Sequence, residues 1–161
     1  MRVRILAVGR LKAGPERELV ARYADRLAKI GRGLGLEPDT TVEIPESRAG
    51  DAATRRREEG AALSRALPER TVLFALDERG KPLDSQALAA HIGDFRDAGR
   101  ASLSLLIGGA DGLDPALSER ADVTIALGRM TWPHQLVRVM LCEQLYRAAT
   151  ILAGHPYHRA G

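Results

Sequence analysis

Short apolar runs recur along the chain, and their spacing differs from that of the segments between them. Each run is rich in aliphatic and β-branched residues and is bounded by Gly, Pro or charged residues, which is typical of strands. We expect strands at Arg2 to Val8, Thr40 to Ile44, Thr71 to Leu76, Ala101 to Ile107 and Asp122 to Leu127. The run TVLFAL is almost continuously apolar, which is typical of a strand buried on both faces of a parallel sheet.

Between these runs the apolar residues repeat at helical spacing, as in Leu19, Tyr23, Leu27 and Ile30. We expect helices at Pro15 to Ile30, Ala52 to Leu67, Ser85 to about Ala98, a short turn from Asp114-Pro115, and His134 to Ala153. The segment Asp77 to Pro82 (DERGKP) is predicted to be a turn. Strands that alternate with helices predict one α/β domain over residues 1–161, with a mostly parallel sheet and helices on both faces.

The composition of the chain indicates in which cellular compartment we expect the protein. No apolar run approaches the roughly 20 residues that span a bilayer, so we expect no membrane partner. The apolar part of MRVRILAVGRL is too short for a signal peptide and no small-residue cleavage site follows it, which favours the cytoplasm. A single cysteine, Cys142, excludes an internal disulfide and fits a reducing compartment.

The net charge of +3 permits an anionic partner without requiring one. Nearly all the basic residues are arginines, a bias that fits phosphate contacts but also a G+C-rich genome. Three consecutive arginines, Arg55, Arg56 and Arg57, precede two glutamates in a predicted helix. Contact with RNA phosphates and a solvated helix face with local charge pairs remain equal alternatives for them.

Candidate chemistry gathers after three predicted strands. In an open α/β sheet, ligands bind beyond the carboxyl ends of strands, and the loops after Leu76, Ile107 and Leu127 qualify. Gly108 and Gly109 let backbone approach a ligand closely, although their spacing matches neither a dinucleotide fingerprint nor a P-loop. A tight strand-to-helix turn explains those glycines nearly as well.

The last predicted helix is apolar over more than one face, so more than one neighbour must cover it. A second copy of the chain is the favoured neighbour, although a central helix in a monomer is the alternative. The chain then ends in the polar tail HPYHR, in which Tyr157, His158 and Arg159 are candidates for acid/base work or RNA contact. His134 and Cys142 have no standard zinc spacing, so we expect no metal.

Four segments together carry a family resemblance: AVG at Ala7 to Gly9, LLIGGADG at Leu105 to Gly112, LGRMTWPHQLVRV at Leu127 to Val139, and EQLYRA with HPYHR between Glu143 and Arg159. Along essentially its whole length the chain resembles the RlmH-type group of the SPOUT methyltransferases, which are S-adenosyl-L-methionine (SAM)-dependent. The combination of segments is specific, whereas one segment alone would not be.

The resemblance implies a fold with a C-terminal trefoil knot, which general packing rules would not suggest. It implies a homodimer in which the tail of one subunit completes the site of the other. It implies N3 methylation of a pseudouridine in large-subunit rRNA, within assembled ribosomes. The implied SAM site comprises Leu76, Gly108, Leu127, Gly128, Arg129, Met130, Thr131 and Trp132.

Within the implied tail, His158 is the candidate general base that accepts the imide proton. Arg159 is the candidate anchor for a phosphate or a nucleobase carbonyl, and Tyr157 is a candidate to stack on a nucleobase. Some positions depart from related chains: Ala110-Asp111 replaces a common Pro-Glu, Gly128 a common Ser, and Trp132 a Leu or Phe. The glycine framework is intact, so we expect activity to be retained. The rival hypotheses are a non-catalytic ribosome-associated assembly factor and a nucleotide- or phosphate-binding α/β enzyme.

Overall fold

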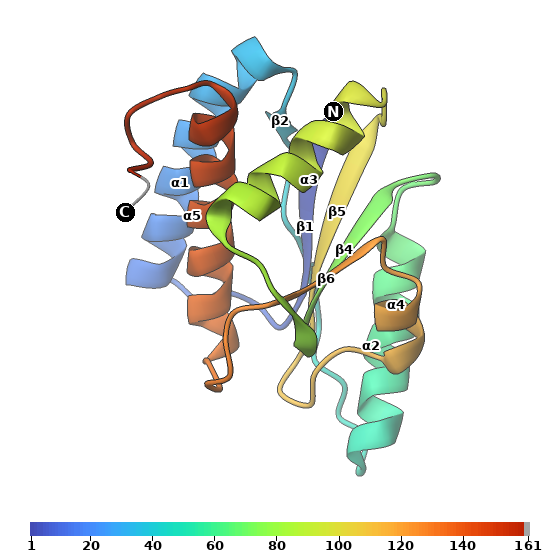
Figure 1. Cartoon of the computed structure of the whole chain (residues 1–161). Helices are drawn as coiled ribbons and strands as arrows, with labels where there is room; N and C mark the ends of the chain where they lie inside the picture. The colour runs from blue at the N-terminus through green and yellow to red at the C-terminus, as the bar shows by residue number, and fades with distance from the viewer. Residues whose placement is uncertain (160–161) are drawn as a thin grey trace.

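Six strands form one sheet in the computed structural model, which describes residues 1–159 (Figure 1). The strands are β1 (Arg2–Val8), β2 (Glu37–Pro38), β3 (Val42–Ile44), β4 (Val72–Pro82), β5 (Ser102–Ile107) and β6 (Val123–Ala126). Their order is β2-β1-β5-β4-β6, with β3 also paired to β1, and all these pairings are parallel. The carboxyl ends of the strands therefore point to one edge of the sheet.

Helices cover both faces of this sheet, as expected (Figure 1). They are α1 (Pro15–Gly31), α2 (Ala52–Ala66), α3 (Ser85–Asp97), α4 (Pro115–Glu119) and α5 (His134–Leu152), with a 3₁₀ turn η1 (Arg32–Leu34) after α1. One layer consists of α1, α3 and α5, and the other of α2 and α4. Among the described residues, none of the helices combines the length and apolar character needed to cross a membrane.

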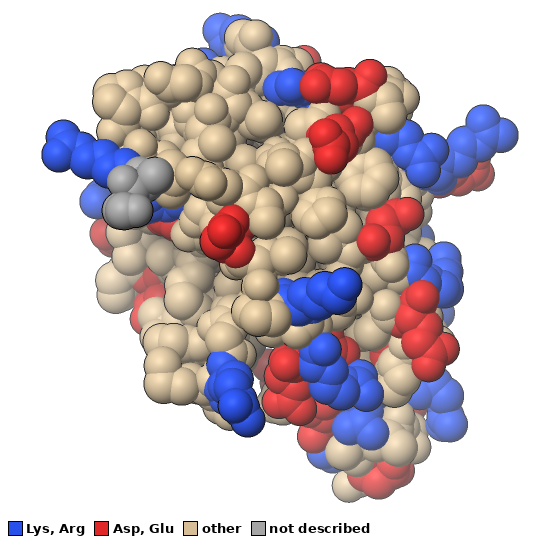
Figure 2. Space-filling view, viewed as in Figure 1, with Lys and Arg blue, Asp and Glu red and all other residues tan. Residues whose placement is uncertain are grey.

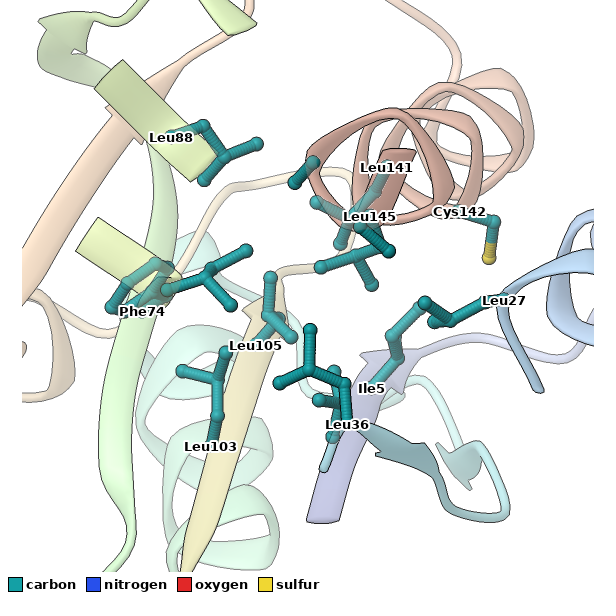
Figure 3. Packing of buried hydrophobic residues seen from close by; sticks show 14 of the residues in the cluster. Ile5, Leu27, Leu36, Phe74, Leu88, Leu103, Leu105, Leu141, Cys142 and Leu145 are labelled. Atoms are coloured by element: carbon teal, nitrogen blue, oxygen red, sulfur yellow. The ribbon is translucent and has the colours of Figure 1, made fainter. Parts of the chain in front are cut away.

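The core is divided into two parts by the alternation of side chains along the strands. Ile5 and Leu105 face α1, α3 and α5, and Leu6 and Leu106 face α2 and α4. Figure 3 shows the larger part, in which Leu145 of α5 lies near the strand residues. Truncation of such a leucine to alanine typically costs about 2–5 kcal/mol, so both layers are firmly held to the sheet.

Short polar side chains begin the helices where the sequence indicated. Asp84 accepts a hydrogen bond from the Ala87 amide at 2.7 Å, and Asp114 accepts one from the Ala116 amide at 2.9 Å. Each such cap contributes about 1 kcal/mol. Asp114 thereby fixes the start of α4 directly after the glycine-rich loop.

The expected turn at Asp77 to Pro82 is wrong, because β4 continues through Pro82. Leu76 and Lys81 both pair with Ile125 of β6, with a register shift between them. A Cβ on Gly80 would lie 2.8 Å from the Ile125 backbone, so only glycine permits this close approach. The short strand β2 was also not predicted, and the trefoil knot stays a prediction.

Candidate functional site

A cavity of about 610 Å³ opens at the carboxyl edge of the sheet, where the loops after β4, β5 and β6 meet. Seven of the eight residues predicted for the SAM site line it: Leu76, Gly108, Leu127, Gly128, Met130, Thr131 and Trp132. The eighth, Arg129, is exposed and lies outside the lining. Loops that are far apart in sequence thus form one pocket, as the strand-end argument predicted.

The glycine-rich loop after β5 folds back tightly. The Gly112 amide donates to the Gly109 carbonyl at 3.0 Å. A Cβ on Gly108 would lie 2.5 Å from the Gly112 carbonyl carbon, and one on Gly109 would lie 2.9 Å from Glu59 Oε2. Gly108 therefore requires glycine because its neighbour is backbone, whereas at Gly109 the close atom is the end of the Glu59 side chain. The loop presents bare backbone to the cavity.

The loop between β6 and α5 forms the opposite wall. Gly128 has φ of +98°, a conformation that favours glycine, and the space around its Cα is open. The indole N–H of Trp132 donates to the Leu127 carbonyl at 3.2 Å, which closes the loop on itself. Met130 is 70% exposed and Trp132 is 37% exposed, so apolar surface is left open at the cavity.

Charged residues are fixed on the cavity rim. Asp77 is hydrogen-bonded by Arg79, and this bond, opposed by burial, lowers the pKa of the carboxyl from 3.8 to about 2. Ser118 Oγ donates to the same carboxylate at 2.9 Å. Asp77 therefore stays ionised at neutral pH and places a fixed negative charge beside the cavity.

The three consecutive arginines of α2 have different surroundings. Arg55 forms a two-point ion pair with Asp111 at 2.6 and 3.0 Å, which lowers the pKa of Asp111. Arg56 donates to the Asp111 carbonyl at 3.4 Å and lines the cavity, whereas Arg57 is exposed. Figure 2 shows basic side chains interspersed with acidic ones toward the part of the molecule where α2 lies. Local charge pairing thus explains Arg55, while Arg56 faces the site.

Arg138 of α5 is a site residue that sequence reasoning missed. Its side chain is 2% exposed and donates to Glu43 Oε1 at 2.6 Å and to the Val8 carbonyl at 3.1 Å, with a further bond to the Gly9 carbonyl. The Leu11 amide donates to the same Glu43 oxygen at 2.8 Å. Arg138 therefore ties the start of α5 to the end of β1. No clear sequence signal marked this role, because α5 also contains the charged residues Glu143 and Arg147.

The predicted catalytic tail lies away from the cavity of its own chain. The cavity is at the start of α5 and the tail follows its end, and 19 helical residues separate them by about 28 Å. Figure 1 shows the tail at the outer side of α5, toward α1. The structure does not bring Tyr157, His158 or Arg159 to the pocket residues of the same subunit.

Within the tail, Tyr157 is held against α5. Its hydroxyl donates to Glu143 Oε1 at 3.0 Å, its ring centre lies 4.8 Å from that of Tyr146, and the Arg147 guanidinium lies 4.8 Å from its ring centre. Burial and the Glu143 hydrogen bond raise the pKa of Tyr157 to about 12. Tyr157 is therefore neutral at physiological pH, and it fixes the direction of the tail.

A second cavity, of about 590 Å³, lies on the other side of Leu127, between the ends of β4 and β6 and helices α1, α3 and α5. Apolar side chains predominate on its walls, among them Leu19, Tyr23, Val139 and Met140. Leu136, near the start of α5, is 40% exposed. Helix α5 thus retains open apolar surface after α1 and α3 have packed on it. Among the described residues there is no cluster of three or more His, Cys, Asp or Glu that could hold a metal ion.

Comparison with known proteins gives a consistent result. A sequence profile described as "Predicted SPOUT methyltransferase" matches residues 1–158. The chain is 62% identical to the Ribosomal RNA large subunit methyltransferase H of Sinorhizobium fredii, over 99% of this chain and 100% of that protein. It is 59% identical to the protein of the same name from Allorhizobium ampelinum, with the same coverage.

Solved structures add information on the fold alone. A crystal structure of a probable methyltransferase from Bordetella pertussis superposes with a TM-score of 0.54 at 17% identity. The match covers 91% of this chain and 95% of that one. The same arrangement of strands and helices therefore occurs in a chain with a very different sequence.

Proposed function

The chain belongs to the SPOUT methyltransferase family, and from this premise we propose that it methylates N3 of a pseudouridine in large-subunit (23S) rRNA with SAM as the methyl donor. We propose that it acts on assembled ribosomes, and hence in the cytoplasm. The observation that carries the proposal is the cavity formed by the three strand-end loops, in a chain whose full-length relatives are named for large-subunit rRNA methylation.

The cavity suits SAM in size and in lining. Its volume of about 610 Å³ lies within the range of roughly 300–1,000 Å³ for small-molecule sites. The residues that would hold the cofactor are Leu76, Gly108, Leu127, Gly128, Met130, Thr131 and Trp132, with bare backbone on one wall and apolar side chains on the other. SAM supplies a methyl group activated by a positively charged sulfur.

The substrate must bring phosphates to the cavity, and the rim offers cations to receive them. Arg56 lines the cavity, and exposed Arg57 and Arg48 lie on and just before α2. Arginine suits phosphate because of its planar, bidentate geometry.

A second copy of the chain completes the site in this proposal. The apolar cavity beside α5 and the exposed Leu136 provide surface for a dimer. Because the tail lies about one helix length from its own cavity, its polar groups act on substrate in the partner's cavity. There Arg159 anchors a phosphate or a nucleobase carbonyl, and Tyr157 stacks on a nucleobase. His158 is the candidate general base, which accepts the imide proton.

Two measurements test the proposal. Mass mapping of 23S rRNA from cells that lack the protein should show one pseudouridine without its methyl group, and the purified protein with labelled SAM should restore it on ribosomes. An unchanged modification pattern would contradict the proposed function.

The role of the tail has its own test. His158→Ala and Arg159→Ala should both reduce methylation, and parent rates in both variants would contradict the tail model without affecting the proposed function.

Calorimetry with SAM separates the rival functions. A non-catalytic assembly factor has no need to bind SAM, whereas the proposed enzyme must bind it. Binding of ATP or NAD in place of SAM would indicate the nucleotide-binding alternative.

The family resemblance also implies a trefoil knot. The refolding rate of the fully denatured chain tests it, and a knotted chain should refold slowly.

A further inference from the structure

One histidine lies inside the cavity of a single subunit and has no role in the proposal above. His134, the first residue of α5, lines the cavity with its side chain 30% exposed. It follows directly on the loop that contains Trp132, so it lies next to the implied cofactor wall. The tail histidine, His158, lies at the other end of the same helix.

The His134 ring is seated on bare backbone at the end of β1. A Cβ on Gly9 would lie 2.9 Å from His134 Cε1 and 3.5 Å from Nδ1, and also 2.9 Å from a carboxylate oxygen of Glu46. Gly9 has φ of +85°, and its carbonyl accepts a hydrogen bond from Arg138. The Arg138 contacts thus hold Gly9 in place, and Gly9 in turn leaves room for both His134 and Glu46.

The two side chains face each other without a direct hydrogen bond. His134 Nε2 lies 3.9 Å from Glu46 Oε1, which is too long for one. His134 lines the cavity, so an N–H group in the cavity can approach its ring, whereas Glu46 stands beside the ring and outside the cavity lining. Nδ1 is buried without a hydrogen-bond partner among the described residues, so no protein group fixes the ring in one tautomer.

We infer that His134, which lines the cavity of one subunit, accepts the proton of the substrate's imide nitrogen, with Glu46 as the carboxylate beside its ring. The inference rests on the proposed function, because it assumes an imide N–H substrate. The N–H bond breaks, its electron pair stays on the nitrogen, and the proton passes to His134 Nε2. The Glu46 carboxylate then balances the imidazolium charge. The nitrogen lone pair is thereby free to take the methyl group. In this arrangement His134 takes the imide proton in place of His158, and the tail residues, His158 included, hold the RNA.

The other charged groups near His134 and Glu46 either form ion pairs of their own or line the cavity. Glu43 of β3 is held by Arg138 of α5, and Asp111 is held by Arg55 of α2. The remaining charged residues of the cavity lining are Arg56 of α2 and Asp77, Glu78 and Arg79 of β4. Glu46 is the carboxylate within reach of the imidazole ring, so it is the partner that the pair requires.

The test compares His134→Gln with His91→Gln, a matched change on α3 outside the cofactor cavity. Methyl transfer to assembled ribosomes that lack the modification is measured at neutral and alkaline pH, together with SAM affinity. Because general-base catalysis typically contributes 10²–10⁴-fold, we expect His134→Gln to reduce kcat roughly 100-fold at neutral pH. The loss should narrow at alkaline pH, where the imide loses its proton to water, and SAM affinity should stay unchanged.

A companion pair of variants tests the carboxylate. Glu46→Gln should reduce kcat less than His134→Gln does, and Glu37→Gln at the opposite end of the sheet should leave it unchanged. The inference is overturned by a parent kcat in His134→Gln, by a loss equal at all pH values, or by a loss that follows SAM affinity. Failure of the parent protein itself to methylate would instead count against the proposed function.

Discussion

The cavity wall and the C-terminal tail are built by different means. The wall consists of strand-end loops fixed by buried contacts: the glycines that allow backbone to meet backbone, and Arg138, which is 2% exposed. The tail is attached to the surface of α5 mainly through Tyr157 and its contacts with Glu143 and Tyr146. The residues that line the cavity come from one subunit, whereas the tail of that subunit lies away from the cavity.

The largest expected effect concerns the anchor of the wall. Arg138→Met leaves Glu43 without its buried partner, and such losses typically cost about 3–5 kcal/mol. Urea unfolding should therefore show a large drop in the free energy of unfolding. The matched change at the tail, Arg147→Met, removes an i,i+4 pair with Glu143 that is partly exposed, and should cost below about 1 kcal/mol. Equal losses would contradict the distinction between the two regions.

The next effect concerns cofactor affinity. Gly108→Val places a side chain where the Gly112 backbone lies 2.5 Å away, and such overpacking typically costs about 1–3 kcal/mol. SAM should bind roughly 10- to 100-fold more weakly. Trp132 is the only tryptophan and lines the cavity, so its fluorescence can report the titration. Gly33→Ala, where the space is open, is the control, and unchanged affinity in Gly108→Val would place SAM elsewhere.

The smallest effect concerns the charge on the rim. The hydrogen bond from Arg79 lowers the pKa of Asp77 to about 2, so the folded state favours the carboxylate. Its contribution to stability is present above the ordinary value of 3.8 and is lost as pH falls toward about 2. Asp77→Asn should lower the free energy of unfolding by about 1 kcal/mol at neutral pH, and the difference from the parent should vanish in acid. A difference that persists at low pH would assign the effect to packing.

Much of the wall could be predicted from the sequence, because period and strand-end geometry are local rules. The strands at Arg2–Val8 and Ser102–Ile107 and the start of α5 at His134 lie where expected. The extension of β4 was missed because its polar residues resemble a turn, and they pair through backbone at an edge that only the folded sheet creates. The contacts of Arg138 with Val8 and Gly9 join residues about 130 positions apart, a separation at which no local pattern gives a signal.

The place of the tail relative to the cavity could not be predicted from local sequence patterns. Its composition marked Tyr157, His158 and Arg159 as functional candidates, but no local pattern indicates which cavity they serve. The length of α5 becomes informative only in the folded chain, where it separates the tail from the cavity of its own chain by about 28 Å. This separation supports the proposal that the tail serves a partner's cavity.

Mixed dimers test this division of labour most directly. One subunit carries Gly108→Val, which disables its cavity, and the other carries His158→Ala with Arg159→Ala, which disables its tail. At a SAM concentration that saturates the parent cavity but lies well below the weakened Kd of Gly108→Val, each variant alone should be nearly inactive as a homodimer. In the mixed dimer the intact tail meets the intact cavity, so methylation should return to about half the parent rate per dimer. If the tail served its own cavity, neither subunit would have an intact site, and a mixed dimer as inactive as its parents would contradict the account.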